Sequence, residues 1–242
     1  MNKQNVLITG ANKGIGLETA RKLSKAGYHV FLGSRDKSKG EQAVEMLHTE
    51  GLTDVELIEI DVTDEESVVG AHKEIAQRTD KLDVLVNNAG ILGLVPQMPS
   101  AADDANIKRV FETNFFGPVR VIRIFMDLLK KSDVPRIVNV TSDLASLTLH
   151  NDPNWIYYPY KSAAYPPSKT ALNAYTVALA YELRNTAFKV NMVNPGHTAT
   201  DFNNYRGTKK ADDAADIIVQ YAMLDANGPS GKFVSDYGET PW

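Results

Sequence analysis

Residues 9–16 read Thr-Gly-Ala-Asn-Lys-Gly-Ile-Gly, directly after a short apolar run and directly before a helical pattern. Gly10 permits a tight turn, Gly14 lets the backbone approach a pyrophosphate, and Gly16 lets a helix pack closely on a sheet. The N-terminus of that helix adds amide donors and the positive end of its dipole. The stretch therefore predicts a phosphate-binding strand–helix turn; a glycine-rich turn without a ligand is the alternative at this point.

Strand-like and helix-like patterns alternate on both sides of this turn. Strands are expected near residues 6–8, 29–33, 55–60, 82–86, 137–140 and 190–193. Helices are expected at about 14–26, 39–49, 65–78, 104–129 (interrupted near Gly117-Pro118), 167–184 and 211–225. This order predicts an α/β fold, a single Rossmann-type doubly wound parallel sheet flanked by helices on both faces. We expect residues 1–242 to form one dinucleotide-binding and catalytic domain, with substrate loops at about 91–102, 143–164 and 197–210.

Composition narrows the functional classes. A hydrophobic content of 43% over 242 residues is enough for one large α/β core. The net charge of −4 comes without a basic cluster, and the apolar runs are strand-sized, so neither a nucleic-acid partner nor a membrane is expected. Cysteine is absent, which excludes disulfides and thiolate chemistry and fits a reducing compartment. With no signal-like N-terminal stretch, the expected location is cytoplasmic, and no metal site is predicted.

The end of the second expected strand indicates which nicotinamide cofactor is used. An NAD-binding fold places an acidic residue about 20 positions after the glycines, whereas Ser34 stands there and Arg35 follows. An arginine can pair with a 2′-phosphate, and Lys13 in the glycine turn adds a second positive charge. We therefore predict NADP(H) rather than NAD(H), although Asp36 lies one position later and both cations could be solvated surface charges.

The glycine spacing G-xxx-G-x-G and several later motifs resemble the short-chain dehydrogenase/reductase family from Thr9 to about Asp201, with an ending similar to its carbonyl-reductase-like subgroup. The motifs are Asp61-Val62, Asn87-Asn88-Ala89-Gly90, Asn114, Thr141-Ser142, Tyr165-Pro166-Pro167-Ser168-Lys169, and Asn194-Pro195-Gly196 with Thr200. The resemblance implies catalytic roles for Asn114, Ser142, Tyr165 and Lys169. It implies cofactor contacts from Gly10, Asn12, Lys13, Gly14, Ile15, Gly16, Ser34, Arg35, Asp61, Val62, Asn88, Ala89, Gly90, Tyr165, Lys169, Pro195, Gly196, Thr198 and Thr200.

The chemistry explains why these residue types are needed. Hydride delivery to a carbonyl produces an alkoxide, and a tyrosine hydroxyl can supply its proton. Lys169 lies four residues after Tyr165, on the same helical face, so its charge is expected to lower the tyrosine pKa. By the resemblance, Lys169 also holds the nicotinamide ribose, Ser142 hydrogen-bonds the substrate oxygen, and Asn114 supports a water that relays protons to Lys169.

A second Tyr-xxx-Lys pair, Tyr157 and Lys161, lies closer to Ser142 in the sequence. We favour Tyr165 because an uninterrupted helical pattern follows Lys169, and because Pro166 and Pro167 suit a first helical turn. This choice leaves a longer segment between Ser142 and the tyrosine than the family usually has.

The substrate side is expected to be apolar. Ser142, Trp155 and Tyr165 are predicted substrate contacts, which suggests an aromatic or apolar ketone, aldehyde or quinone; packing of the aromatics against the protein body is the alternative.

The predicted function is an NADP(H)-dependent oxidoreductase that interconverts a small-molecule carbonyl and an alcohol. A cofactor-sensing binding protein, or an epimerase or dehydratase, is the competing class, disfavoured by the Tyr-Lys pair, the glycine spacing and the short stretch after Thr200. The sequence leaves monomer and homo-oligomer open.

Overall fold

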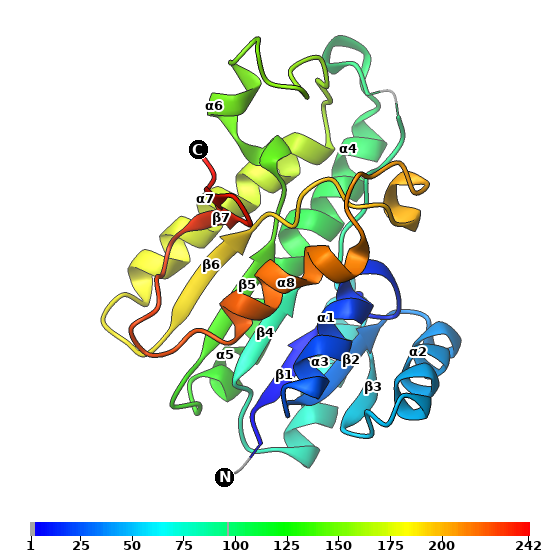
Figure 1. Ribbon diagram of the computed structural model, residues 1–242, viewed down its shortest axis with the longest axis vertical. Helices are drawn as coiled ribbons and strands as arrows, with labels where there is room; N and C mark the ends of the chain where they lie inside the picture. The colour runs from blue at the N-terminus through cyan, green and yellow to red at the C-terminus, as the bar shows by residue number, and fades with distance from the viewer. Residues whose placement is uncertain (1–2, 96) are drawn as a thin grey trace.

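The computed structural model describes residues 3–95 and 97–242. Residues 1, 2 and 96 lie outside the described residues. Residue 96 falls in the expected substrate loop 91–102. The strands form one eight-stranded sheet in the order β3-β2-β1-β4-β5-β6-β7-β8, with only β8 antiparallel (Figure 1). The bounds are β1 Asn5–Ile8, β2 His29–Ser34, β3 Val55–Glu59, β4 Val84–Asn87, β5 Arg136–Val140, β6 Lys189–Val193, β7 Phe233–Ser235 and β8 Gly238–Glu239. The predicted fold class is confirmed.

The central strands are apolar on both sides because helices cover both faces of the sheet. Val6, Leu7 and Ile8 of β1 are completely buried, yet alternate side chains belong to two different cores. A parallel sheet needs a crossover between neighbouring strands, and each crossover helix covers one face. Continuous apolar runs, rather than alternating ones, therefore specify these strands.

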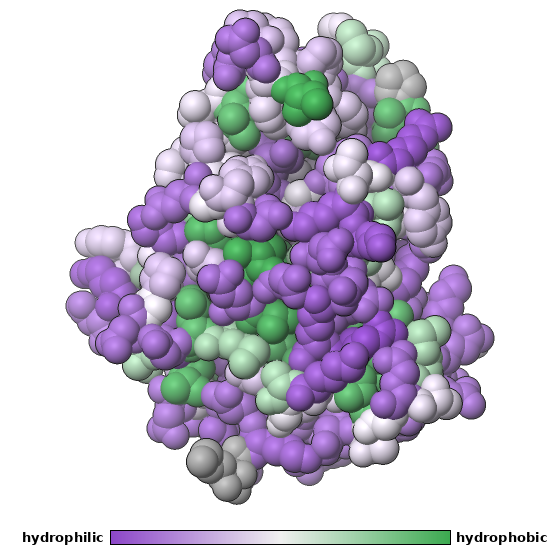
Figure 2. All heavy atoms as spheres, in the orientation of Figure 1, coloured by the Kyte–Doolittle hydropathy of each residue, from purple (hydrophilic) through white to green (hydrophobic). Residues whose placement is uncertain are grey.

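The helices form two layers around the sheet (Figure 1). One core lies between the sheet and α1 (Gly14–Lys25), α2 (Lys37–Thr49) and α8 (Ala211–Ala222). The other lies between the sheet and α3 (Glu65–Arg78), α5 (Gly117–Leu129) and α7 (Tyr165–Glu182). On the face shown in Figure 2, the surface is mainly hydrophilic and the apolar areas are small and separate. In the described part of the chain, no helix is both long and apolar enough to cross a bilayer.

The long helical pattern over residues 104–129 contains a π-helical turn. Helix α4 (Asp104–Phe111) runs into a π segment (Glu112–Phe116), and α5 begins at Gly117. The expected interruption near Gly117-Pro118 is thus a π turn just before it. Gly117 is required there because a Cβ would lie 2.9 Å from Val62 Cγ2. Widened turns of this type often occur at functional sites, and this one carries Asn114.

Further differences lie outside the long periodic segments. The expected loop 143–164 contains a 3-10 turn (Asp143–Ala145) and a short helix, α6 (Leu147–His150). Strands β7 and β8 were not predicted, because they contain three and two residues and carry almost no periodicity. Helix α7 begins at Tyr165 rather than at residue 167, and α8 ends at Ala222 rather than at residue 225. The C-terminal Trp242 carbonyl accepts a hydrogen bond from the Thr148 amide, so the end of the chain packs against α6.

Candidate active site

The glycine turn after β1 has the conformation that its sequence predicts. Gly10 and Gly14 have φ values of +63° and +58°, in the left-handed region that favours glycine. A Cβ on Gly10 would lie 2.9 Å from the Ala89 Cα atom, and a Cβ on Gly16 would lie 2.5 Å from Asn88 Nδ2. The turn is therefore packed against the residues after β4, and its open side faces the cavity described below.

Asn88 explains how two distant motifs form one surface. Its side-chain amide donates hydrogen bonds to the Thr9 and Gly10 carbonyls, at 2.9 and 3.0 Å. The Thr9 hydroxyl in turn accepts hydrogen bonds from the Asn88 and Ala89 backbone amides. Helix α1 begins at the end of this turn without a side-chain cap. Its first amides remain available as donors to an anionic group in the turn.

Asp36 is not available as a ribose-binding acid. Its carboxylate caps α2 by accepting a hydrogen bond from the Lys39 amide at 3.1 Å, and it also forms an ion pair with the Lys39 amine. The predicted cofactor residue Ser34 does not line the cavity: it is buried, and its hydroxyl donates to the Asp36 carbonyl at 2.8 Å. Ser34 therefore shapes the turn around Arg35, which does line the cavity.

Lys13 and Arg35 differ in their surroundings, which the sequence did not show. The Lys13 amine forms an ion pair with Asp201 at 2.5 Å, across the opening of the cavity. Among the described residues, Arg35 has no acidic side chain within ion-pair distance. Arg35 is therefore an unpaired cation lining the cavity, whereas Lys13 joins the glycine turn to the loop after β6.

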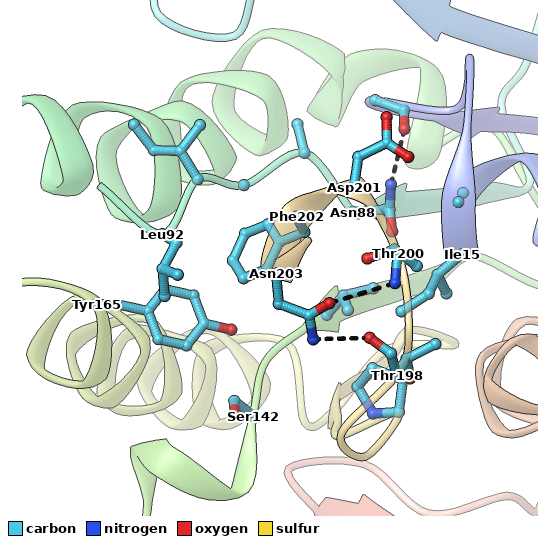
Figure 3. Close-up of a pocket in the computed structure, with 18 of the residues that line it drawn as sticks. Ile15, Asn88, Leu92, Ser142, Tyr165, Thr198, Thr200, Asp201, Phe202 and Asn203 are labelled. Carbon is cyan, nitrogen blue, oxygen red and sulfur yellow. Dashed lines mark hydrogen bonds between the residues drawn. The ribbon is translucent and has the colours of Figure 1, made fainter. Parts of the chain in front are cut away.

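A cavity of about 640 Å³ runs along the carboxyl ends of the central strands. Its walls are built from the glycine turn, the loops after β2 to β6, and the beginning of α7. Except for Ser34, all the predicted cofactor residues line it. Figure 3 shows Tyr165 and Ser142 facing the same space as Phe202 and the Thr198–Asn203 segment. This is the crevice at which open parallel sheets bind ligands.

Tyr165 and Lys169 lie on one face of α7 at the deep end of the cavity. They are 8% and 4% exposed, and the Lys169 amine lies 6.0 Å from the centre of the Tyr165 ring. The amine donates a hydrogen bond to the Val140 carbonyl at 2.8 Å, and burial lowers its pKa to about 8. Burial raises the pKa of Tyr165 well above its ordinary value, and the Ser142 hydroxyl acts in the opposite direction. The expected lowering of the tyrosine pKa by Lys169 is therefore not seen in the structure, where burial raises that pKa.

Asn114 braces the site rather than lining it. Its Oδ1 atom accepts a hydrogen bond from the Ile91 amide at 2.8 Å, and its Nδ2 atom donates to the Ile91 carbonyl at 2.9 Å and to Ser168 Oγ at 3.0 Å. A Cβ on Gly90 would lie 3.4 Å from Asn114 Oδ1 and 3.6 Å from the Lys169 amine. The side chain therefore connects the strand β4 loop to α7, and its amide is engaged by protein partners instead of being free for a water.

Ser142 begins the 3-10 turn after β5. Its hydroxyl accepts a hydrogen bond from the Leu144 amide at 3.2 Å and donates to the Asp143 carboxylate at 3.2 Å. Asp143 also lines the cavity, and burial raises its pKa. Asp143 was not among the predicted site residues, although its position directly after Ser142 was a signal for it.

The alternative pair has a different environment. Tyr157 lines the cavity, but the Lys161 amine lies on the exposed side, where it donates to the His150 carbonyl at 2.8 Å and lies 4.2 Å above the Tyr158 ring. The structure brings Ser142, Tyr165 and Lys169 together and leaves Lys161 out.

The aromatic lining of the cavity differs from the expected one. Trp155 does not line the cavity; its ring packs edge-on against His150 and Tyr157, so the predicted substrate contact is replaced by packing within the segment. Tyr160 and Phe202 are lining residues that the sequence did not reveal, and the Phe202 ring centre lies 5.4 Å from that of Tyr165. We call Tyr157, Tyr160 and Phe202 the aromatic lining.

Comparison with known proteins places this geometry among characterised enzymes. A family model described as short chain dehydrogenase matches residues 4–211. The (+)-neomenthol dehydrogenase of Arabidopsis thaliana is 33% identical, and the match covers 95% of each chain. The structure of salutaridine reductase from Papaver somniferum has a TM-score of 0.84 and 30% identity, covering 95% of this chain and 98% of that one. The structure of ElxO with NADP bound has a TM-score of 0.81 and 28% identity, covering 95% of each chain.

Proposed function

This chain belongs to the short-chain dehydrogenase family, and from that membership we propose that it is an NADP(H)-dependent oxidoreductase that interconverts a small-molecule carbonyl and the corresponding alcohol. One observation carries the proposal. A glycine turn suited to a phosphate and a candidate acid–base pair, Tyr165 with Lys169, lie at two ends of the same cavity of about 640 Å³.

The residues at the turn fit a dinucleotide with a 2′-phosphate. The left-handed Gly10 and Gly14, together with the uncapped start of α1, form a surface suited to a pyrophosphate. Arg35 offers an unpaired guanidinium where the adenine ribose would lie, while Asp36 is occupied at the α2 cap. ElxO, a relative with this fold, binds NADP. These features support NADP(H) over NAD(H).

When bound, the nicotinamide supplies or accepts the hydride. In the direction of reduction, Tyr165 donates its proton to the oxygen that becomes an alkoxide, since its raised pKa keeps the hydroxyl protonated until that charge develops. The Ser142 hydroxyl, which donates to Asp143 in the structure, would turn to donate its hydrogen bond to the same oxygen. The Lys169 amine, which titrates near the operating pH, holds a ribose hydroxyl and supplies positive charge beside Tyr165.

Asn114 acts in this proposal as a positioning residue. Because its amide holds Ile91 and Ser168, it sets the distance between the β4 loop and α7, on which Lys169 lies. A proton relay toward Lys169 would then use a water held by other atoms of the π turn. The widened turn is what places Asn114 within reach of both elements.

The substrate is proposed to be a cyclic or aromatic carbonyl compound with a largely apolar skeleton, or its alcohol. The aromatic lining provides apolar surface next to Ser142 and Tyr165. Relatives are named for neomenthol and salutaridine. We propose a cytoplasmic location on the strength of the cysteine-free sequence.

The direct test is NADPH oxidation with a panel of ketones, aldehydes and quinones, read from the loss of NADPH absorbance. We expect turnover that falls by at least about a hundredfold in Tyr165→Phe, because the proton donor is removed. Tyr157→Phe is the matched control, since it removes a cavity hydroxyl outside α7. A dead Tyr157→Phe beside an active Tyr165→Phe would reassign the acid. Tight NADPH binding without any turnover would favour a cofactor-sensing protein.

A further inference from the structure

Asp143 is a carboxylate within the reacting region that the proposed chemistry does not use. It directly follows Ser142, and its Oδ1 atom lies 3.2 Å from the Ser142 hydroxyl. A substrate oxygen hydrogen-bonded to that hydroxyl at about 2.8 Å would therefore lie within about 6 Å of the carboxylate. Asp143 is thus close enough to act on a group attached near the substrate carbonyl.

The carboxylates that line the cavity differ in their partners. Asp201 is paired with the Lys13 amine, Asp61 accepts two hydrogen bonds from Thr63, and Asp143 accepts one from the Ser142 hydroxyl. For Asp143, no basic side chain within the described ranges lies at ion-pair distance. His197 is the basic group whose charge acts on it, in the direction that lowers its pKa, and burial outweighs this effect.

An unpaired carboxylate at this position opposes the proposed reduction. The negative charge of Asp143 raises the pKa of both Tyr165 and Tyr157, so its field reaches the hydroxyls of the site. The same field would destabilise the alkoxide that develops beside Ser142. A neutral apolar substrate would leave this repulsion in place. A positive charge on the substrate would cancel it.

Resting on the proposed function, the geometry points to a substrate class: we propose that the enzyme prefers carbonyl compounds with a cationic amine about three bonds from the carbonyl carbon, held by Asp143. The 3.2 Å between the Ser142 hydroxyl and the carboxylate keeps such an amine close to the carbonyl, and three bonds is the spacing used in the test below. Tyr157 and Tyr160 present aromatic rings in the same cavity, and aromatic faces attract ammonium groups. Asp143 is then the specificity residue, and Ser142 holds the carbonyl.

The test compares two ketones of the same shape. Dimethyl-oxopiperidinium carries a permanent quaternary nitrogen opposite its carbonyl, and dimethylcyclohexanone has a carbon atom in that place. The measurement is the ratio of kcat/KM for the cation to kcat/KM for the neutral ketone, with NADPH. We expect Asp143→Asn to reduce this ratio at least about tenfold, as for a partly buried ion pair. The two ketones differ in intrinsic reactivity and hydration, but these differences are the same for the wild type and the variant, so they cancel when the two ratios are compared.

Two further variants identify the cause. Asp143→Glu retains the charge and should retain most of the preference. Asp201→Asn removes a cavity carboxylate that Lys13 already neutralises, so the ratio should stay as in the wild type. An unchanged ratio in Asp143→Asn overturns the inference. Equal losses for both ketones also overturn it, because they would mean that Asp143 only positions the Ser142 hydroxyl.

A binding readout separates this inference from the proposed function. Calorimetry with the NADP⁺-loaded protein should show tighter binding of the cationic ketone than of the neutral one, and Asp143→Asn should abolish that difference. If the wild type reduces neither ketone but binds the cation in an Asp143-dependent way, the inference stands and reduction of these ketones fails. If it reduces both ketones without preference, the function stands and the inference fails.

Discussion

Replacing Lys169 by methionine should change the stability of the protein in a pH-dependent way. The amine is 4% exposed, and burial lowers its pKa from 10.5 to about 8. The unfolded chain therefore binds more protons than the folded protein between these two pH values. Burial of the charged amine therefore lowers the free energy of unfolding at neutral pH. This penalty disappears as the pH rises from about 8 to 10.5, and the pKa shift corresponds to about 3 kcal/mol.

Methionine removes the buried charge but keeps most of the side-chain volume. At pH 7 it also removes the hydrogen bond from the amine to the Val140 carbonyl, a loss of about 1–3 kcal/mol. Lys169→Met should therefore be about as stable as the wild type, or slightly more stable, at pH 7. By about pH 10.5, where the lysine is neutral in the folded protein and half protonated in the unfolded chain, the wild type should have gained about 3 kcal/mol relative to the variant.

The assay is urea unfolding followed by circular dichroism at several pH values, with NADPH turnover measured in parallel. At each pH, the free energy of unfolding of the variant is subtracted from that of the wild type. The contributions of all other titrating groups, which the two proteins share, then cancel. Lys161→Met is the matched control, since it alters the exposed lysine of the second Tyr-xxx-Lys pair. If the stability difference for Lys169→Met were as independent of pH as that of the control, the folded protein would not desolvate this amine.

Two other changes test the ends of the site. Arg35→Ala should weaken NADPH binding by about tenfold or more and leave NADH binding nearly unchanged, because only NADPH carries the 2′-phosphate; fluorescence titration with both nucleotides measures this, and equal losses would contradict the assignment. Asn114→Ala should lower the free energy of unfolding by about 1–3 kcal/mol, since the Ile91 amide and carbonyl lose their partner. Asn114→Asp keeps an acceptor for the Ile91 amide but buries a carboxylate against the Ile91 carbonyl, so it should lose at least as much, and denaturant unfolding measures both variants.

The sequence by itself determined the features that depend on neighbouring residues. Continuous apolar runs separated by helical patterns predict a parallel sheet because each strand is covered on both faces. The glycine turn was predictable for the same reason: Gly10 and Gly14 occupy left-handed positions that few other residues adopt. Tyr165 and Lys169 share a face because four residues make about one turn of a helix.

Only the tertiary structure decided the features that depend on residues far apart in the chain. The ion pair between Lys13 and Asp201 joins two loops, and the Asn114 brace joins the β4 loop to α7 through a π turn that no periodicity signals. Burial of Lys169 distinguishes it from Lys161, which has the same spacing to a tyrosine. Local sequence patterns reflect the backbone conformation and burial of one continuous segment. Which side chains meet across the cavity depends on how the loops pack, and that long-range packing leaves no periodic mark in the sequence.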